Sequence, residues 1–270
     1  GQSNTFVGFQ SGLFTTTGGA NTFVGSAAGT GITGTRLTGS NNTSVGQGSG
    51  EKLQGAGNAN TLIGRSAGQS LTTGSENTFI GDLSGTRGTD ATTAGSCILI
   101  GHDTGTSGAG STSQILLGID TQATADNTFH VGLGSNLISI AINGSTTTFS
   151  ASSDERLKEN VTTSTAGLSF LKELRPVTYN WKKKKDVPSN MPYFYEEDSD
   201  DPCVGEGKTY HGFVAQEIKT ALDNHTEIKD GQDIWHEDDH GTQRVSPAAL
   251  VPILVKAIQE LEARIATLEG

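Results

Sequence analysis

The fold of this chain is decided by the stretch Asn21-Thr22-Phe23-Val24-Gly25-Ser26-Ala27-Ala28-Gly29. The same order of Asn, Thr, an apolar residue, Val or Ile, and Gly recurs along residues 1–152 in eight copies, which become less regular toward the end. The first glycines of the copies stand at positions 8, 25, 46, 64, 81, 101, 118 and 132, so their spacing varies between 14 and 21 residues. A pattern repeated at this period indicates stacked coils whose turns take up the extra residues.

Each copy is typical of a short strand, because Gly, Thr, Ser and Asn are poor helix formers and the centre of the unit is β-branched or aromatic. Alternation along a strand predicts two rows of side chains on opposite faces. One row contains Val7, Val24, Val45, Ile63, Ile80, Ile100, Leu117 and Val131, and the other contains Phe6, Phe23, Ser44, Leu62, Phe79, Leu99, Leu116 and His130. A thin coil can bury only one of these faces, so we expect the other to contact sister chains.

The repeat also predicts a ladder of stacked Asn amides and glycines at the corners of the coils. We therefore predict a repetitive all-β half, a parallel β-helix or β-roll-like array, in residues 1–152. A flexible Gly/Ser/Thr linker is the alternative, but a linker would not repeat an apolar pair in phase. Because Gly1 falls inside a repeat unit, we expect the chain to be the C-terminal part of a longer protein.

Composition changes sharply after residue 152 of the 270-residue chain. Residues 1–152 have four basic and seven acidic residues, residues 153–270 have fourteen and twenty-two, and the net charge is −11. An acidic chain repels phosphate backbones, so we expect no nucleic-acid partner. Since no apolar run approaches about eighteen residues, we expect no membrane insertion. Cys97 falls on a repeat position, which favours packing, and nothing in the sequence indicates a cofactor or a metal.

Residues 153–270 are typical of an α+β domain that ends in a coiled-coil helix. We expect a helix over 168–174 that ends before Pro176, strands over 177–181 and 210–214, and a helix from 215 to about 222. Ser246 and Pro247 are expected to cap and start the last helix, which Pro252 should kink. Its apolar residues alternate at spacings of three and four, as in a coiled-coil seam, and are Val251, Leu254, Ile258, Leu261, Ile265 and Leu268.

A family resemblance lies in four segments of this half. They are Ser153-Asp154-Glu155-Arg156-Leu157-Lys158-Glu159-Asn160, residues 171–179, Gly212-Phe213-Val214-Ala215-Gln216-Glu217, and residues 250–261. In order and spacing they resemble the C-terminal intramolecular chaperone domain of phage endosialidases, tailspikes and tail fibres, which also occurs in myelin regulatory factor. The upstream repeats resemble the arrays of tail fibres and trimeric adhesins. The resemblance implies that three chains assemble through residues 153–270, forming an intertwined β shaft, and that each chain then cuts itself.

Carried over residue by residue, the resemblance makes Ser153 the nucleophile, Lys158 the general base and the Ser152–Ser153 peptide the scissile bond. The chemistry suits these residues, because a serine hydroxyl needs a base and a lysine serves as one only when burial favours its neutral form. The alternative is structural. Ser152 and Glu155 fit a capping box, in which Ser152 or Ser153 only caps a helix. A helical Ser153 would also point roughly 140° away from Lys158, so the dyad requires Ser153 outside the helix or a lysine from a neighbouring chain.

Further candidates are weaker. Asp154, His211, Gln216 and Glu217 are possible supporting residues for the cleavage site, although a buried, satisfied His211 is the structural alternative. The stretch 236–240, with a histidine at each end, has metal-capable side chains, but a polar loop between strands explains it better.

Three functions compete at this point. The first is the distal region of a phage tail fibre or tailspike, a self-cleaving homotrimer that binds a host cell-surface receptor, either polysaccharide or protein, and resides in the virion after assembly in the host cytoplasm. The second is a structural trimer with a dead site. The third is an adhesin-like or transcription-factor-like precursor outside a virus. No glycosidase activity is expected, because the repeats contain no obvious pair of catalytic carboxylates.

Overall fold

The computed structural model describes residues 1–143, 150–151, 153–191, 194, 198–228 and 234–270. The chain divides into two compact units, Gly1–Lys158 and Glu159–Gly270. The boundary lies after Lys158, so the segment that carries Ser153 and Lys158 belongs to the first unit.

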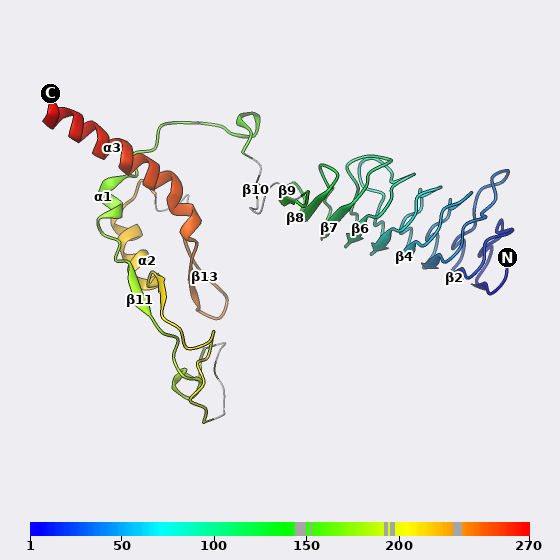
Figure 1. Cartoon of the computed structure of the whole chain (residues 1–270), viewed down its shortest axis with the longest axis horizontal. Helices are drawn as coiled ribbons and strands as arrows, with labels where there is room; N and C mark the ends of the chain where they lie inside the picture. Colours follow the sequence, from blue (N-terminus) through cyan, green and yellow to red (C-terminus); the bar gives the residue numbers. More distant parts are fainter. Residues whose placement is uncertain (144–149, 152, 192–193, 195–197, 229–233) are drawn as a thin grey trace. The chain divides into compact units, whose positions relative to one another are not determined.

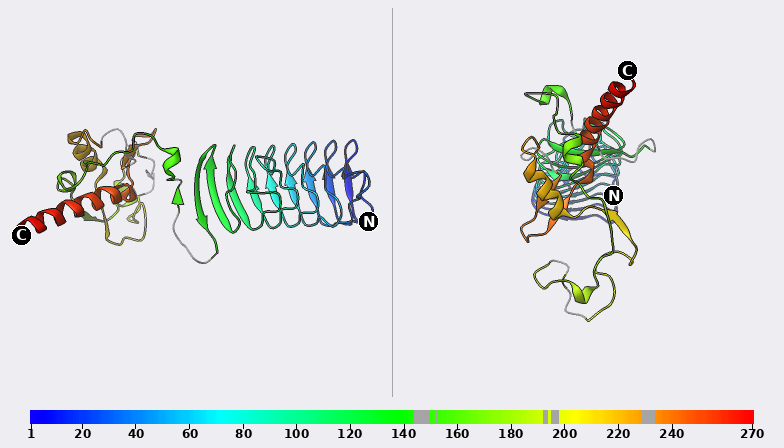
Figure 2. Two further views of the ribbon diagram at one scale, coloured as in Figure 1. Left: turned by 90° about the horizontal axis from the view of Figure 1, so that it is seen from above. Right: turned by 90° about the vertical axis from the view of Figure 1, so that its left-hand side faces the viewer.

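The first unit is a parallel β-solenoid of about eight turns, as the repeat predicts. Figures 1 and 2 show its coils stacked in sequence order, with the strands of successive coils side by side. The parallel strands are β1 (Thr5–Val7), β2 (Thr22–Val24), β3 (Thr43–Val45), β4 (Thr61–Ile63), β5 (Thr78–Ile80), β6 (Ile98–Ile100), β7 (Gln114–Ile119) and β8 (Thr128–Leu133). Two antiparallel strands, β9 (Asn136–Ala141) and β10 (Ser150–Ala151), end the sheet.

The two predicted rows occupy opposite faces of the sheet. The row that contains Phe23, Ser44, Leu62, Phe79, Leu99, Leu116 and His130 is buried inside the solenoid, except for its first member, Phe6, which is 39% accessible. The Val/Ile row points outward and is partly exposed, with Val7 56% and Val131 43% accessible. Each outward residue is in register with its counterpart in the next coil, from Val7 and Val24 to Leu117 and Val131. The solenoid thus buries one apolar row and leaves the other on its surface.

A ladder of buried asparagines runs along the interior, as the sequence predicts. The Asn42 Oδ1 atom accepts hydrogen bonds from the Asn60 backbone N–H (3.1 Å) and from Asn60 Nδ2 (2.9 Å), and Asn60 repeats both contacts with Asn77. Since buried amides are costly unless hydrogen-bonded, the ladder fixes the register of the coils. The corner glycine Gly25 has φ +136°, and a Cβ there would lie 2.5 Å from the Gly46 carbonyl oxygen. Only glycine permits that close approach.

The second unit is a small α/β fold. Its elements are α1 (Leu168–Leu171), β11 (Val177–Tyr179), η2 (Lys184–Asp186), β12 (Tyr210–Gly212), α2 (Ala215–Asn224), β13 (Trp235–Glu237), β14 (Gln243–Val245), η3 (Pro247–Leu250) and α3 (Val251–Glu269). The strands form two antiparallel pairs, β11 with β12 and β13 with β14. The core contains Phe170 of α1, Ile218 and Leu222 of α2, Ile234, and Ile253 of α3.

Four details of this unit differ from the sequence prediction. Helix α1 ends at Leu171 rather than 174, and the strands β11 and β12 are each two residues shorter than expected. Ser246 precedes η3 but makes no side-chain capping hydrogen bond. Pro252 does not kink a continuous helix, because α3 begins at Val251 and the proline lies in its first turn, where no N–H partner is required.

None of the helices within the described ranges has both the length and the apolar character that a membrane span requires.

Candidate self-cleavage site

The solenoid sheet ends one residue before the predicted scissile bond. Strand β10 pairs antiparallel with β9, and Ser150 and Ala151 are in register with Ser139 and Ile138. Ser152 lies outside the described residues, and Ser153 belongs to no helix or strand. A cut between Ser152 and Ser153 would therefore leave all ten strands of the sheet on the N-terminal product.

The residue that caps the following turn is Asp154. Helix η1 (Glu155–Leu157) is a single 3-10 turn, and its N-cap Asp154 accepts a 2.9 Å hydrogen bond from the Arg156 backbone N–H. The Arg156 guanidinium contacts the same carboxylate at 3.0 and 2.7 Å. These side-chain and backbone hydrogen bonds lower the pKa of Asp154. The capping role that the sequence allowed for Ser153 is thus filled by its neighbour.

Ser153 and Lys158 are in contact. The Lys158 Nζ atom lies 2.8 Å from Ser153 Oγ, within hydrogen-bonding distance. Ser153 stands outside η1, and Lys158 has extended backbone angles (φ −120°, ψ 143°) directly after it. The intervening turn brings the lysine side chain back to the serine. The sequence required either that Ser153 lie outside the helix or that the lysine come from a neighbouring chain. The first of these holds, and the contact forms within one chain.

The surroundings of this pair are open. Both residues are exposed in the single chain. A charged lysine can only donate to a serine hydroxyl, and it accepts the hydroxyl proton only as a neutral amine, which burial favours. The contact therefore supplies the geometry of a serine–lysine pair, whereas the desolvation that chemistry requires has to come from a further partner.

The remaining predicted residues belong to the second unit. His211 is exposed on β12, so the buried alternative for this histidine is wrong. His211 and Gln216 border a hollow of about 740 Å³ whose wall includes Tyr179 and Trp181. Glu217 is bound by the Arg175 guanidinium, which lowers the pKa of the glutamate. These contacts define no role at the cleavage segment, so the supporting roles of His211, Gln216 and Glu217 stay predictions.

The stretch that begins at His236 forms the end of β13 and the turn before β14, as predicted for a polar loop. Asp238 accepts hydrogen bonds from the backbone of His240 and Thr242 and from Arg244, which together lower the pKa of its carboxyl to about 2. Within the described ranges, no three His, Cys, Asp or Glu side chains gather in a way that could hold a metal ion. Cys97 is fully buried in the solenoid core, as its repeat position predicts.

Sequence reasoning missed one polar cluster. His225 follows α2 with only 9% exposure, and its two ring nitrogens face Glu227 (2.9 Å) and Glu173 (3.1 Å). Hydrogen bonds to Glu227 and then to Glu173 raise the pKa of His225, and burial opposes this rise. The only signal was His225 two residues before Glu227, because Glu173 is 52 positions away.

Comparison with known proteins gives one match, in the C-terminal half of the chain. Residues 153–227 match the family model described as chaperone of endosialidase, a family of self-cleaving serine peptidases. Neither the curated proteins nor the solved structures gave a match. The matched segment begins at Ser153, directly after the residues that join it to the solenoid. Residues 153–227 therefore match the endosialidase-chaperone family of serine-peptidase-like intramolecular chaperone domains.

Proposed function

We propose that this chain is the distal region of a phage tail fibre or tailspike, in which the C-terminal chaperone drives assembly of three copies and is then released by self-cleavage at Ser152–Ser153. The observation that carries the proposal is the 2.8 Å contact between Ser153 Oγ and Lys158 Nζ, two residues beyond the last strand of the solenoid.

The chemistry follows from the positions of these atoms. Neutral Lys158 takes the hydroxyl proton of Ser153, and Oγ attacks the carbonyl carbon of Ser152. The peptide C–N bond breaks as the Ser153 nitrogen takes the proton back from the Lys158 ammonium, which leaves an ester between the two serines. Water, deprotonated by Lys158, then hydrolyses that ester. The products are a carboxylate at Ser152 and a free amine and hydroxyl at Ser153, after a single turnover.

Assembly supplies the missing desolvation. In one chain Lys158 is exposed to water. Packing of neighbouring copies around residues 153–158 would exclude water and favour the neutral amine. Cleavage would then follow correct assembly instead of preceding it.

The surface of α3 supports self-association. One face of this helix is buried in its own unit through Ile253 and Ala257, and Glu260 accepts a 2.9 Å hydrogen bond from the Leu168 N–H. The predicted seam lies on exposed positions, where Ile258 is 64% and Leu268 87% accessible. A helix with a second apolar stripe in water is typical of a coiled-coil strand. The count of three rests on the family resemblance.

The solenoid fits a rigid shaft or tip that presents a surface to the host. Apart from the apolar rows of its strands, the repeat region is rich in Gly, Ser, Thr and Asn, which suits a polysaccharide or protein receptor on the cell surface. On this proposal the mature protein resides in the virion, after assembly in the host cytoplasm.

Intact mass spectrometry of the purified full-length chain tests the proposal. Self-cleavage predicts two fragments, one ending at Ser152 and one starting at Ser153. A single full-length species in a folded oligomer would favour the alternative, a structural trimer with a dead site. That alternative draws on one observation, the exposure of both Ser153 and Lys158.

A further inference from the structure

The outer face of the solenoid changes character along its length. Beside the Val/Ile row runs a second outward row, which begins with threonine in β1–β5 and is apolar from β6 onward. The register of the sheet aligns its later members, which are Ile98, Ile115, Phe129 and Ile140. In the same strands the first row contains Ile100, Leu117, Val131 and Ile138. Two adjacent apolar rows therefore cover the face of β6–β9, whereas the face of β1–β5 has only one.

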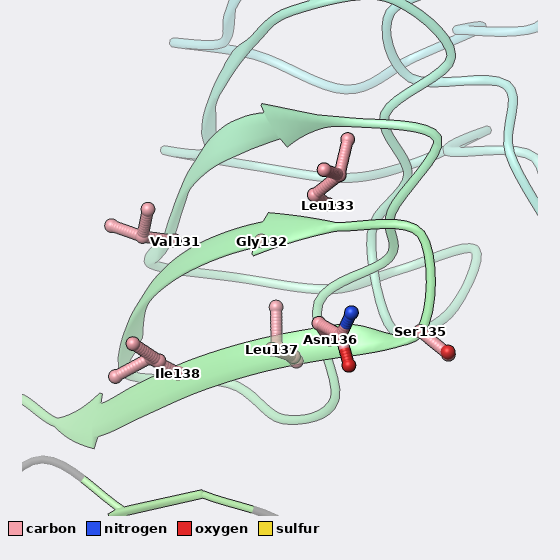
Figure 3. Close-up of a pocket in the computed structure, with 7 residues that line it drawn as sticks. All are labelled: Val131, Gly132, Leu133, Ser135, Asn136, Leu137 and Ile138. Atoms are coloured by element: carbon pink, nitrogen blue, oxygen red, sulfur yellow. The ribbon is translucent and has the colours of Figure 1, made fainter. Parts of the chain in front are cut away.

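Much of this face is in contact with water in the single chain. Leu133 is 62% accessible, Ile119 50%, Ile138 49% and Ile100 40%. With Ile98, Leu117 and Val131 the exposed apolar side chains amount to on the order of 500 Å², near the upper limit for the largest patch of a monomeric protein. Figure 3 shows Val131 and Ile138 projecting from neighbouring strands to the same side, at a hollow of about 510 Å³.

The chemistry of the face points to a second copy as its occupant. Strands β6–β9 contain no Asp, Glu, Lys or Arg, so this face offers no ion-pair partner to a charged ligand. It also lacks the charged side chains that commonly prevent sheets from associating. Its ridges repeat at the strand spacing of about 4.8 Å, so the same face of another copy presents matching ridges and grooves. The exposed apolar area, on the order of 500 Å², is more than half of one side of a standard protein interface, roughly 800 Å² per partner.

The face is also continuous with the cleavage segment. Ala151 of β10 is in register with Ile138, and Ser153 follows two residues later. Copies that meet on β6–β9 would therefore meet next to the strand that leads into the serine–lysine pair.

We propose that the outer face of β6–β9 is the primary contact between copies of this chain, and that the threonine-lined face of β1–β5 adds less to their association. The inference rests on the proposed self-association. It adds where the copies touch and which strands contribute most to their association. A threonine row keeps its hydroxyls hydrated, so burying it yields less free energy than burying isoleucine.

Light scattering on the full-length chain tests this inference with Val131→Glu and the matched variant Val45→Glu. Val45 stands in the same row in β3, with 36% exposure against 43% for Val131. A buried carboxylate at position 131 should raise the concentration for half-association by about tenfold or more, and Val45→Glu should raise it less. Circular dichroism verifies that both variants retain the β-solenoid.

Equal effects of the two variants, or an unchanged Val131→Glu oligomer, would overturn the inference while leaving self-association intact. A wild-type chain that remains monomeric at every concentration would overturn both this inference and the proposed self-association. The milder variant Val131→Cys, in a Cys203→Ser background, provides a second measurement. It does not require the solenoid to fold with a charged side chain at position 131. Oxidation should link copies through position 131, and the absence of linked species in a folded oligomer would contradict the proposed contact.

Discussion

Lys158 Nζ lies 2.8 Å from Ser153 Oγ, and the two residues are separated in the chain by Asp154 and the single turn η1. The turn is stabilised by Asp154, which binds the backbone and the guanidinium of Arg156. The position of the proposed base thus depends on a residue that touches neither the hydroxyl nor the amine.

Removing this cap should slow self-cleavage. Asp154→Ala deletes the acceptor for the Arg156 N–H, so η1 loosens and the lysine spends less time near the serine. Asp154→Asn retains a good capping side chain and should retain most of the cleavage rate. Time-resolved mass spectrometry gives both rates. If Asn slows cleavage as much as Ala, the charge of Asp154 matters and its capping role does not.

The asparagine ladder should dominate the stability of the solenoid. Asn60→Ala leaves the Asn77 N–H and the Gly74 carbonyl without their buried partners, which should cost about 2–4 kcal/mol. The control is Asn58→Ala, because Asn58 is exposed and its amide bonds mainly to Ala56 and Ser75. Urea unfolding measures both variants. A loss for Asn58→Ala as large as that for Asn60→Ala would argue against the ladder.

His225 should make the second unit less stable as the pH rises. Hydrogen bonds to Glu227 and Glu173 raise its pKa from 6.5, and its place after the C-terminus of α2 also favours the cation. A raised folded-state pKa gives stability that is complete below the unfolded pKa and is lost as the pH rises through the folded value. The fluorescence of Trp235 during urea unfolding reports this unit. His225→Gln should flatten its pH dependence between about 6 and 8, and an unchanged slope would exclude His225 as the cause.

His130 should have the opposite effect in the first unit. Burial lowers its pKa from 6.5, and its Nδ1 atom has no hydrogen-bond partner among the described residues. Stability from the neutral imidazole is present above the unfolded pKa and is lost as the pH falls through the folded value. Leu116 and Leu99 occupy the same row in preceding coils, so His130→Leu should fit and remove the acid sensitivity. Thermal unfolding of the variant at pH 5 and pH 7.5 tests this, and a retained difference would contradict it.

The repeat alone was enough to predict the solenoid, its Asn ladder and its two rows of side chains. It could not decide which row lies inside, because both rows are mostly apolar. The structure buries the row that contains Phe23 and Phe79, where the larger rings fill the coil.

The local cap and the histidine cluster were harder to predict for different reasons. Ser152, Ser153 and Asp154 are all good capping residues, so the sequence alone could not choose the N-cap among these three positions. The structure selects Asp154 because Arg156 binds its carboxylate. The partners of His225 come from separate elements, and pairing of that kind appears only once the unit is folded.

The most direct test of the account is the intact mass of the Ser153→Ala chain measured beside the wild type, after both are purified as folded oligomers. The account predicts wild-type fragments that end at Ser152 and begin at Ser153, and a Ser153→Ala oligomer that remains full length. Cleavage of Ser153→Ala at the same bond, or a wild-type oligomer that is never cut, would contradict it.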